Sequence, residues 1–154
     1  EDAARQKEIN AIKMVSPDFD NDPLPEARTV DGVTIYPVKK QNTPAGYAVK
    51  TFSEKGFSGH IELMAGFNAD GTINSITVLQ HKETPGLGTK MAEPKFLDQF
   101  FGKDPESFTL KVKKDGGQVD AITAATISSR AFCDALQRAS DALGTVNDST
   151  RILP

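Results

Sequence analysis

The clearest pattern in the chain is a period of two over residues 59–68, GHIELMAGFN. Apolar side chains at 61, 63, 65 and 67 alternate with a set that is only partly polar, His60, Glu62, Met64 and Gly66. The same period returns in residues 72–81, and the Ala-Asp-Gly at residues 69–71 between them has the chemistry of a hairpin turn. A half-buried strand sends every second side chain into the core, so this spacing predicts an antiparallel hairpin. Two earlier segments rich in β-branched and aromatic residues, 33–38 and 46–52, predict further strands.

Helical patterns occupy both ends of the chain and one short segment between them. Residues 2–14 contain no helix breaker and gather apolar side chains loosely along one side. Residues 93–102 have a proline near their start, which favours a short helix. After residue 126 apolar side chains recur at helical spacing as far as Gly144, which is expected to stop the helix.

The order of these elements predicts the fold class. Residues 16–27 contain three prolines and are expected to be a connecting loop, and residues 108–112 are expected to form one more strand. Helix, strands, short helix, strand and helix in this order predict an α+β fold. We expect an antiparallel sheet of hairpins packed with an N-terminal helix, a short middle helix and a C-terminal helix.

Composition narrows the possible functions. The 154 residues carry a net charge of −3, which argues against a nucleic-acid-binding protein. A single cysteine, Cys133, excludes an intrachain disulfide and is expected to be a packing residue of the last helix. Two histidines are too few to suggest a zinc site, so no metal ligand is predicted.

Hydroxyls and alanines concentrate just before the last helix, in residues 120–129, DAITAATISS. The N-terminus of a helix leaves amide groups unpaired and carries partial positive charge, so it attracts a capping hydroxyl or an anion. Thr123, Thr126 and Ser128 stand where a cap is needed, although one hydroxyl is enough. The small side chains between them leave the backbone uncovered, which also permits a phosphate group. The spacing alone leaves both interpretations open.

A glycine-rich loop follows the predicted hairpin at residues 81–90, HKETPGLGTK. Pro85 stiffens this turn, while Gly86 and Gly88 allow the backbone to approach a planar ligand closely. Leu87 between the glycines is suited to lie against a flat ring. The alternative is a hairpin exit that needs glycine for its backbone conformation alone.

Residues 120–126, DAITAAT, resemble the flavinylation motif of the FMN-binding domain family: Asp, two residues of any type, Ser or Thr, then Gly-Ala-Thr. Residues 83–88, ETPGLG, are similar to a second element of that family, and residues 55–59, KGFSG, resemble its approach to this loop. The resemblance covers roughly residues 45–143. The family includes the RnfG and NqrC subunits of ion-pumping electron-transfer complexes.

The resemblance implies that Thr126 carries FMN through a phosphoester bond, which a dedicated flavin transferase makes. It implies that this transferase reads Asp120, although a solvated carboxylate fits that position equally well. Glu83 is expected either to contact the flavin ring or to cap a turn. No residue is expected to be catalytic, because the flavin supplies the chemistry. The implied cofactor-binding residues are Thr126, Thr123, Ala124, Ala125, Ser128, Glu83, Thr84, Gly86, Leu87 and Gly88.

Ala124 departs from the family, which has glycine at this position. If its methyl group only crowds the junction, Ala124→Gly should be flavinylated at least as fast. Glycine loses about 0.5–1 kcal/mol relative to alanine in regular structure, so a modest loss of stability is expected. The departure also favours an alternative in which the domain keeps the fold without the flavin, as an extracytoplasmic sensor or interaction module.

The expected organisation is an N-terminal helix and linker at residues 1–27, an FMN-binding domain at 28–144 and an irregular tail at 145–154. The resemblance implies an electron-carrier flavoprotein most like RnfG of the Rnf complex, a translocase that links ferredoxin and NAD redox chemistry to ion transport. An NqrC-type component of a Na⁺-translocating NADH:quinone reductase, or a unit of another flavin-dependent reductase, is the alternative. The isolated domain is expected to turn over no substrate.

The resemblance also implies a location and partners. It places the domain on the periplasmic side of the inner (cytoplasmic) membrane, held by a single-span anchor upstream of residue 1. The expected partners are the other subunits of the electron-transfer complex and the flavin transferase, with no nucleic acid.

Overall fold

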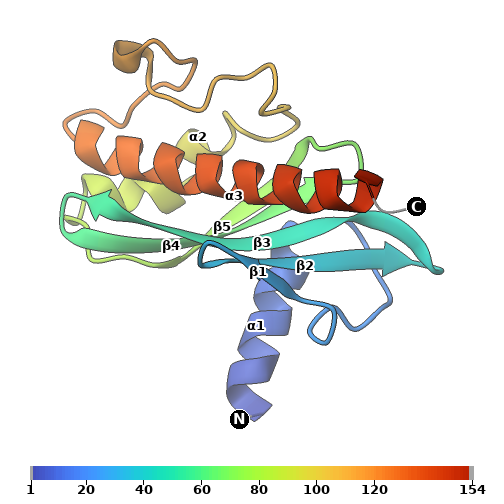
Figure 1. The fold of residues 1–154 in the computed structure, drawn as a ribbon. Helices are drawn as coiled ribbons and strands as arrows, with labels where there is room; N and C mark the ends of the chain where they lie inside the picture. The colour runs from blue at the N-terminus through green and yellow to red at the C-terminus, as the bar shows by residue number, and fades with distance from the viewer. Residues whose placement is uncertain (1, 153–154) are drawn as a thin grey trace.

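Five antiparallel strands form one sheet in the order β1-β2-β3-β4-β5, with helices on both faces (Figure 1). The computed structural model describes residues 2–152. Each strand pairs with the next along the sequence, so every connection within the sheet is a hairpin. The α+β prediction is confirmed. The strands are β1 (Arg28–Val30), β2 (Val33–Lys40), β3 (Thr43–Gly56), β4 (Gly59–Asn68) and β5 (Ile73–Gln80).

The β2–β3 hairpin turns at Gln41 and Asn42, which have positive φ angles of 50° and 66°. Two successive residues of this kind give the tight turn whose twist matches the flanking strands. Lys40 therefore pairs directly with Thr43. The strands predicted at residues 33–38 and 46–52 are thus confirmed, each extended toward this turn.

Helix α1 (Asp2–Val15) lies on one face of the sheet and leads away from it toward the N-terminus (Figure 1). Ile12 and Val15 are fully buried in a small core on this face. The carbonyl oxygen of Val15 accepts a hydrogen bond of 2.7 Å from the Asn74 side chain. None of the described helices is both long and apolar enough to cross a membrane.

Helix α3 (Thr126–Ile152) covers the opposite face of the sheet and closes the main core. Phe132 and Leu136 are fully buried there, and the Thr51 hydroxyl of β3 donates a 2.7 Å hydrogen bond to the Ala135 carbonyl. Cys133 is 3% exposed within this core, and burial raises the pKa of its thiol to about 12. The prediction that Cys133 is a packing residue is therefore confirmed.

The strand predicted at residues 108–112 is wrong. An irregular segment connects β5 to α3, with three short helical turns and one isolated bridge between Val112 and Val119. Leu110 and Val112 are buried, which explains the alternating pattern, but the backbone forms local bonds such as Lys113 N–H to the Val119 carbonyl. The turns are η1 (Gly88–Ala92), α2 (Pro94–Leu97) and η2 (Lys113–Asp115), so the helix expected in residues 93–102 is present but short.

Gly144 does not end the last helix, contrary to prediction, and residues 145–152 of the expected irregular tail are helical. A glycine stop requires a left-handed backbone, and Gly144 is not among the residues with positive φ. Glycine inside a helix costs only about 1 kcal/mol. Val146, two residues after Gly144, is only 8% exposed and packs in the main core, and its burial offsets that cost. Residues 153 and 154 lie outside the described residues.

Candidate functional site at the start of α3

The chain enters α3 through a tight turn. The Ala125 amide donates to the Ile122 carbonyl at 3.0 Å, and the Ala125 carbonyl accepts the first helical bond from Ser129 N–H at 3.0 Å. Ala125 is therefore the N-cap residue, and Thr126 is the first helical residue. Within the described part of the chain, the amides of Thr126, Ile127 and Ser128 have no backbone or side-chain acceptor. Three donors and the positive end of the helix dipole thus meet beside the Thr126 side chain.

Ser129 closes this turn from inside the helix. Its buried hydroxyl accepts a 2.9 Å bond from the Ile122 amide and donates a 2.9 Å bond to the Ala125 carbonyl. These bonds hold the turn before α3 closed but leave the first amides of the helix unpaired, and the Thr126 hydroxyl takes no part in them. Sequence reasoning missed Ser129, although a fourth hydroxyl at the end of the run was its signal.

Ala124 adopts a left-handed backbone with φ of 64°. This conformation costs a residue with a Cβ atom roughly 1–2 kcal/mol, whereas glycine adopts it freely. A glycine at this position would therefore adopt the turn without strain. This backbone argues against the modest loss of stability expected for glycine at position 124, because that estimate started from regular structure.

We expect Ala124→Gly to raise the free energy of unfolding by about 1 kcal/mol, since it removes backbone strain without removing a buried contact. Urea titration of the two proteins measures this change. Ala121→Gly is the matched control: Ala121 is exposed and has no positive φ, so glycine there should be neutral or destabilising. Equal losses of stability in both variants would contradict the strained turn.

A cavity of about 400 Å³ lies beside Thr126. This volume falls within the roughly 300–1,000 Å³ typical of small-molecule sites. The cavity brings the two sequence motifs together, because one wall comes from the glycine-rich loop and another from the start of α3. Its lining residues are Phe57, Thr84, Leu87, Gly88, Ala124, Ala125, Thr126, Ile127 and Ser128.

Gly86 and Gly88 have different structural roles in the loop. Gly86 has φ of 77° and completes a turn in which the Leu87 amide donates to the Thr84 carbonyl at 3.0 Å. Gly88 packs closely against its neighbours: a Cβ atom there would lie 2.5 Å from the Ser128 Oγ and 2.6 Å from the Glu83 Cβ. Gly86 therefore shapes the loop, while Gly88 permits its contact with α3.

Glu83 lies beneath the cavity rather than in its wall. The side chain is 4% exposed, and its carboxylate accepts bonds of 2.9 Å from the Phe57 and Ser58 amides and 2.5 Å from the Ser128 hydroxyl. Of the two roles expected for Glu83, this geometry matches the turn cap. Burial acts to raise its pKa, but the three hydrogen bonds outweigh it and hold the pKa of Glu83 below the usual value.

Because the folded-state pKa of Glu83 is lowered, its contribution to stability is complete above the ordinary glutamate pKa of about 4.3 and is lost as the pH falls through the folded-state value. Glu83→Gln should lower the free energy of unfolding at pH 7 by about 1–3 kcal/mol, as expected for impaired buried hydrogen bonds. Urea titrations between pH 7 and 3 should show a constant difference from the parent down to about pH 5 that then shrinks. A difference independent of pH would contradict the ionised carboxylate.

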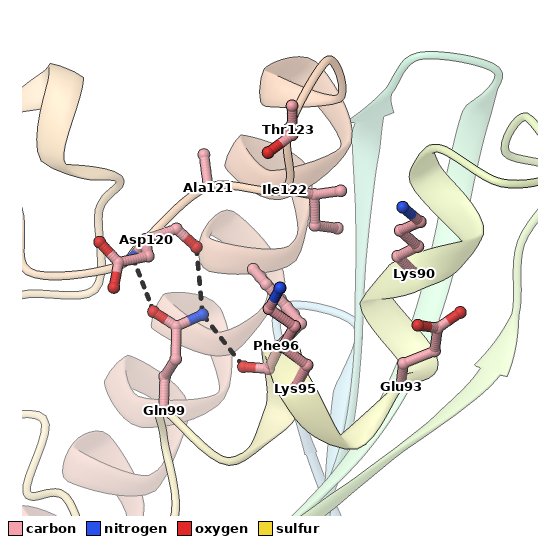
Figure 2. Close-up of a pocket in the computed structure, with 9 residues that line it drawn as sticks. All are labelled: Lys90, Glu93, Lys95, Phe96, Gln99, Asp120, Ala121, Ile122 and Thr123. Carbon is pink, nitrogen blue, oxygen red and sulfur yellow. Dashed lines mark hydrogen bonds between the residues drawn. The ribbon is translucent and has the colours of Figure 1, made fainter.

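A second cleft, of about 240 Å³, lies on the other side of the motif turn (Figure 2). Here the Gln99 side chain holds the backbone of Asp120: its oxygen accepts the Asp120 amide at 2.6 Å, and its nitrogen donates to the Asp120 carbonyl at 3.1 Å. The Asp120 carboxylate is exposed and pairs with Lys113 at 2.7 Å. Thr123 lines this cleft and not the cavity beside Thr126.

The structure thus gathers most of the expected cofactor-binding residues around one cavity. Glu83 supports that cavity from below, Gly86 shapes the loop beside it, and Thr123 lies in the neighbouring cleft. Sequence reasoning missed Phe57 and Ile127, which also line the cavity.

Three unpaired amides, one hydroxyl at the first helical residue and an adjoining apolar cavity fit a cofactor with a phosphate at one end and a flat ring at the other. The molecule is therefore an α+β domain of the class that holds a phosphate-bearing aromatic cofactor at a helix N-terminus. Residues 56–141, more than half of the chain, match the sequence profile described as "FMN-binding domain". The chain belongs to the FMN-binding domain family, and its cofactor is FMN.

Several proteins with named roles are similar to this chain. It is 39% identical over 110 residues to the G subunit of the ion-translocating oxidoreductase complex of Aliivibrio fischeri (strain MJ11), which covers 68% of this chain and 52% of that protein. Identity to the protein of the same name from Methanosarcina acetivorans is 39% over 146 residues, covering 90% and 75%. Identity to the G subunit of the Na(+)-translocating ferredoxin:NAD(+) oxidoreductase complex of Acetobacterium woodii is 40% over 101 residues, covering 63% and 48%. The chain spans about half the length of the first and third of these relatives.

Two solved structures share the fold. The C subunit of the Na(+)-translocating NADH-quinone reductase from Parabacteroides distasonis gives a TM-score of 0.56 at 25% identity, covering 70% of this chain and 58% of that one. NqrC of Shewanella oneidensis gives 0.54 at 23% identity, covering 80% and 60%, which supports the fold alone.

Proposed function

We propose that this chain is the FMN-carrying electron-transfer domain of an RnfG protein, the G subunit of an ion-translocating oxidoreductase complex of the Rnf type, and that FMN is esterified to Thr126. The family and the RnfG relatives support the complex and the cofactor. The observation that carries the attachment site is the position of Thr126. It is the first residue of α3, beside three unpaired amides, and lies in the wall of the cavity of about 400 Å³.

In this proposal, different residues around Thr126 hold different parts of the cofactor. Thr126 would hold FMN through its hydroxyl oxygen: an O–P bond would form as a P–O bond of the flavin donor breaks, and the hydroxyl proton would leave with the donor's departing group. The product would equal protein plus FMN less one water. The unpaired amides of Thr126, Ile127 and Ser128 stabilise the phosphate charge. Phe57, Leu87 and Ile127 would give the ring end of the ligand an apolar wall. Bound FMN supplies one- or two-electron transfer, and we expect no turnover by the isolated domain.

The proposal extends to partners and location. Subunits of an ion-translocating complex work with the other subunits of that complex, and a flavin transferase is needed to make the ester. The side chain of Asp120 is 70% exposed, so it is accessible to such an enzyme. We place the domain on the periplasmic side of the cytoplasmic membrane, with a single-span anchor preceding it.

The alternatives fit less well. An NqrC-type role is supported by the Parabacteroides distasonis structure, but its identity of 25% is well below the 39% to the Methanosarcina acetivorans protein. A flavin-free sensor module was favoured only by Ala124. Since Ala124 already adopts the left-handed backbone that glycine would adopt, its presence leaves the turn unchanged.

The test is to produce the protein together with its flavin transferase and to measure its intact mass. We expect a gain equal to FMN less one water, mapped by peptide fragmentation to Thr126. Protein made without the transferase is the control and should be colourless yet folded, because the core does not depend on the flavin. An unlabelled protein, or a label on Thr123 or Ser128, would contradict the proposal.

A further inference from the structure

Exposed apolar surface is concentrated at the cavity beside Thr126. Among the side chains that the structure describes, four large apolar ones are strongly exposed, and three of them line this cavity: Phe57, Leu87 and Ile127, at 66%, 38% and 47%. The fourth, Met14, lies on α1 across the sheet. An exposed aromatic ring at the mouth of a cavity is suited to pack against a flat aromatic ligand.

The position of Phe57 is set by its backbone. Phe57 and Ser58 form the tip of the β3–β4 hairpin, and their amides donate to the two different oxygens of the Glu83 carboxylate at 2.9 Å each. The hairpin approaches this carboxylate closely: a Cβ atom at Gly56 would lie 2.5 Å from the Gly59 carbonyl oxygen and 3.2 Å from the Glu83 carboxylate. Moving the carboxylate therefore moves the hairpin tip and the Phe57 ring with it.

The same carboxylate also reaches the attachment site. The Ser128 hydroxyl donates to Glu83 at 2.5 Å, and Ser128 stands two residues after Thr126 on the first turn of α3. One buried charge thus ties the hairpin tip to the helix that holds the phosphate end of the ligand. Small errors in such positioning change how a bound ring packs.

We propose that Phe57 packs against the flavin ring, and that Glu83 is the positioning residue that holds Phe57 there through the Phe57 and Ser58 amides. This inference rests on the proposed function, because it requires FMN on Thr126. Glu83 itself does not contact the ring. In its neutral analogue glutamine an NH₂ group replaces one of the two oxygens, so in this geometry one of the two amides would face a donor instead of an acceptor.

Phe57→Trp tests the ring contact. The chain contains no tryptophan, so the new indole is a unique reporter. An indole in van der Waals contact with an excited flavin quenches its emission by transient electron donation, after which the electron returns. In protein flavinylated on Thr126, Phe57→Trp should lose most of the flavin fluorescence and shorten its lifetime. Met14→Trp, on the exposed side chain across the sheet, is the matched control and should leave the lifetime unchanged.

Adding Glu83→Gln to Phe57→Trp tests the positioning role. We expect flavin fluorescence to recover in part, with the label on Thr126 retained. Glu83→Asp, which keeps the charge but retracts it by one carbon, should act in the same direction and serves if the glutamine variant does not fold. Thr51→Val is the control for a general loss of stability. It removes a different buried hydrogen bond to α3 and leaves the bonds of Glu83 to the hairpin in place.

The outcomes separate the two proposals. Mass spectrometry comes first, and a parent protein without FMN on Thr126 overturns the proposed function together with this inference. A labelled Phe57→Trp protein with the parent lifetime overturns the ring contact alone. Quenching that Glu83→Gln and Glu83→Asp leave unchanged, or that Thr51→Val relieves equally, overturns the positioning role of Glu83.

Discussion

Thr126→Ala, produced together with the flavin transferase, is expected to carry no covalent FMN and to remain folded. Alanine has no oxygen with which to form the ester. The fold should tolerate the change, because Ser129 and not Thr126 closes the turn before α3, and the Thr126 hydroxyl makes no hydrogen bond within the described residues. We expect a stability change within about 0.5 kcal/mol, as for surface substitutions. Intact mass and urea titration measure the two effects.

Two further variants test whether the loss of covalent FMN is specific to removal of the Thr126 hydroxyl. Thr126→Ser keeps a hydroxyl at the first helical residue and should still be labelled. Thr123→Ala removes the other threonine of the motif, which lies in the neighbouring cleft, and should also be labelled. Label that persists in Thr126→Ala would show that another hydroxyl receives the phosphate.

Gly88→Ala is expected to destabilise the protein about as much as Glu83→Gln. Its Cβ atom would lie 2.5 Å from the Ser128 Oγ and 2.6 Å from the Glu83 Cβ, closer than nonbonded atoms can approach. The loop must therefore move away from α3 and weaken the bond between Ser128 and Glu83. Overpacking of this kind costs about 1–3 kcal/mol, and we expect a loss in that range.

Gly144→Ala is the matched control for Gly88→Ala. A Cβ atom at Gly144 meets nothing within 4 Å, and Gly144 lies inside α3. Alanine there should stabilise the protein by about 1 kcal/mol because of its higher helix propensity. Thermal or urea unfolding of both variants gives opposite signs if the contact at Gly88 is real. A Gly88→Ala protein as stable as the parent would mean that the loop and α3 do not pack closely.

The elements with a strong local period could be predicted from the sequence. The hairpin of β4 and β5, the helix α1 and the start of α3 lie where their hydrophobic spacing predicts them, because an element beside a core places apolar side chains every 2 or about 3.6 residues. The burial of β4 itself does not alternate, since Met64 on its other face is buried in the small core under α1. The predicted strand at residues 108–112 failed because alternating burial occurs there without a partner strand. The predicted stop at Gly144 failed because Val146 still reaches the core.

The sequence by itself predicted which residues carry the chemistry: Thr126 with its hydroxyl-rich run, and the glycine-rich loop at residues 83–88. Only the tertiary structure decided how they are arranged. Glu83 bonds to groups 25, 26 and 45 residues away, so its role as a cap beneath the cavity follows from packing that no local pattern records. The left-handed backbone of Ala124 and the closure of the turn by Ser129 depend in the same way on how the chain enters α3. The sequence specifies each side chain, whereas the groups that it contacts depend on the fold.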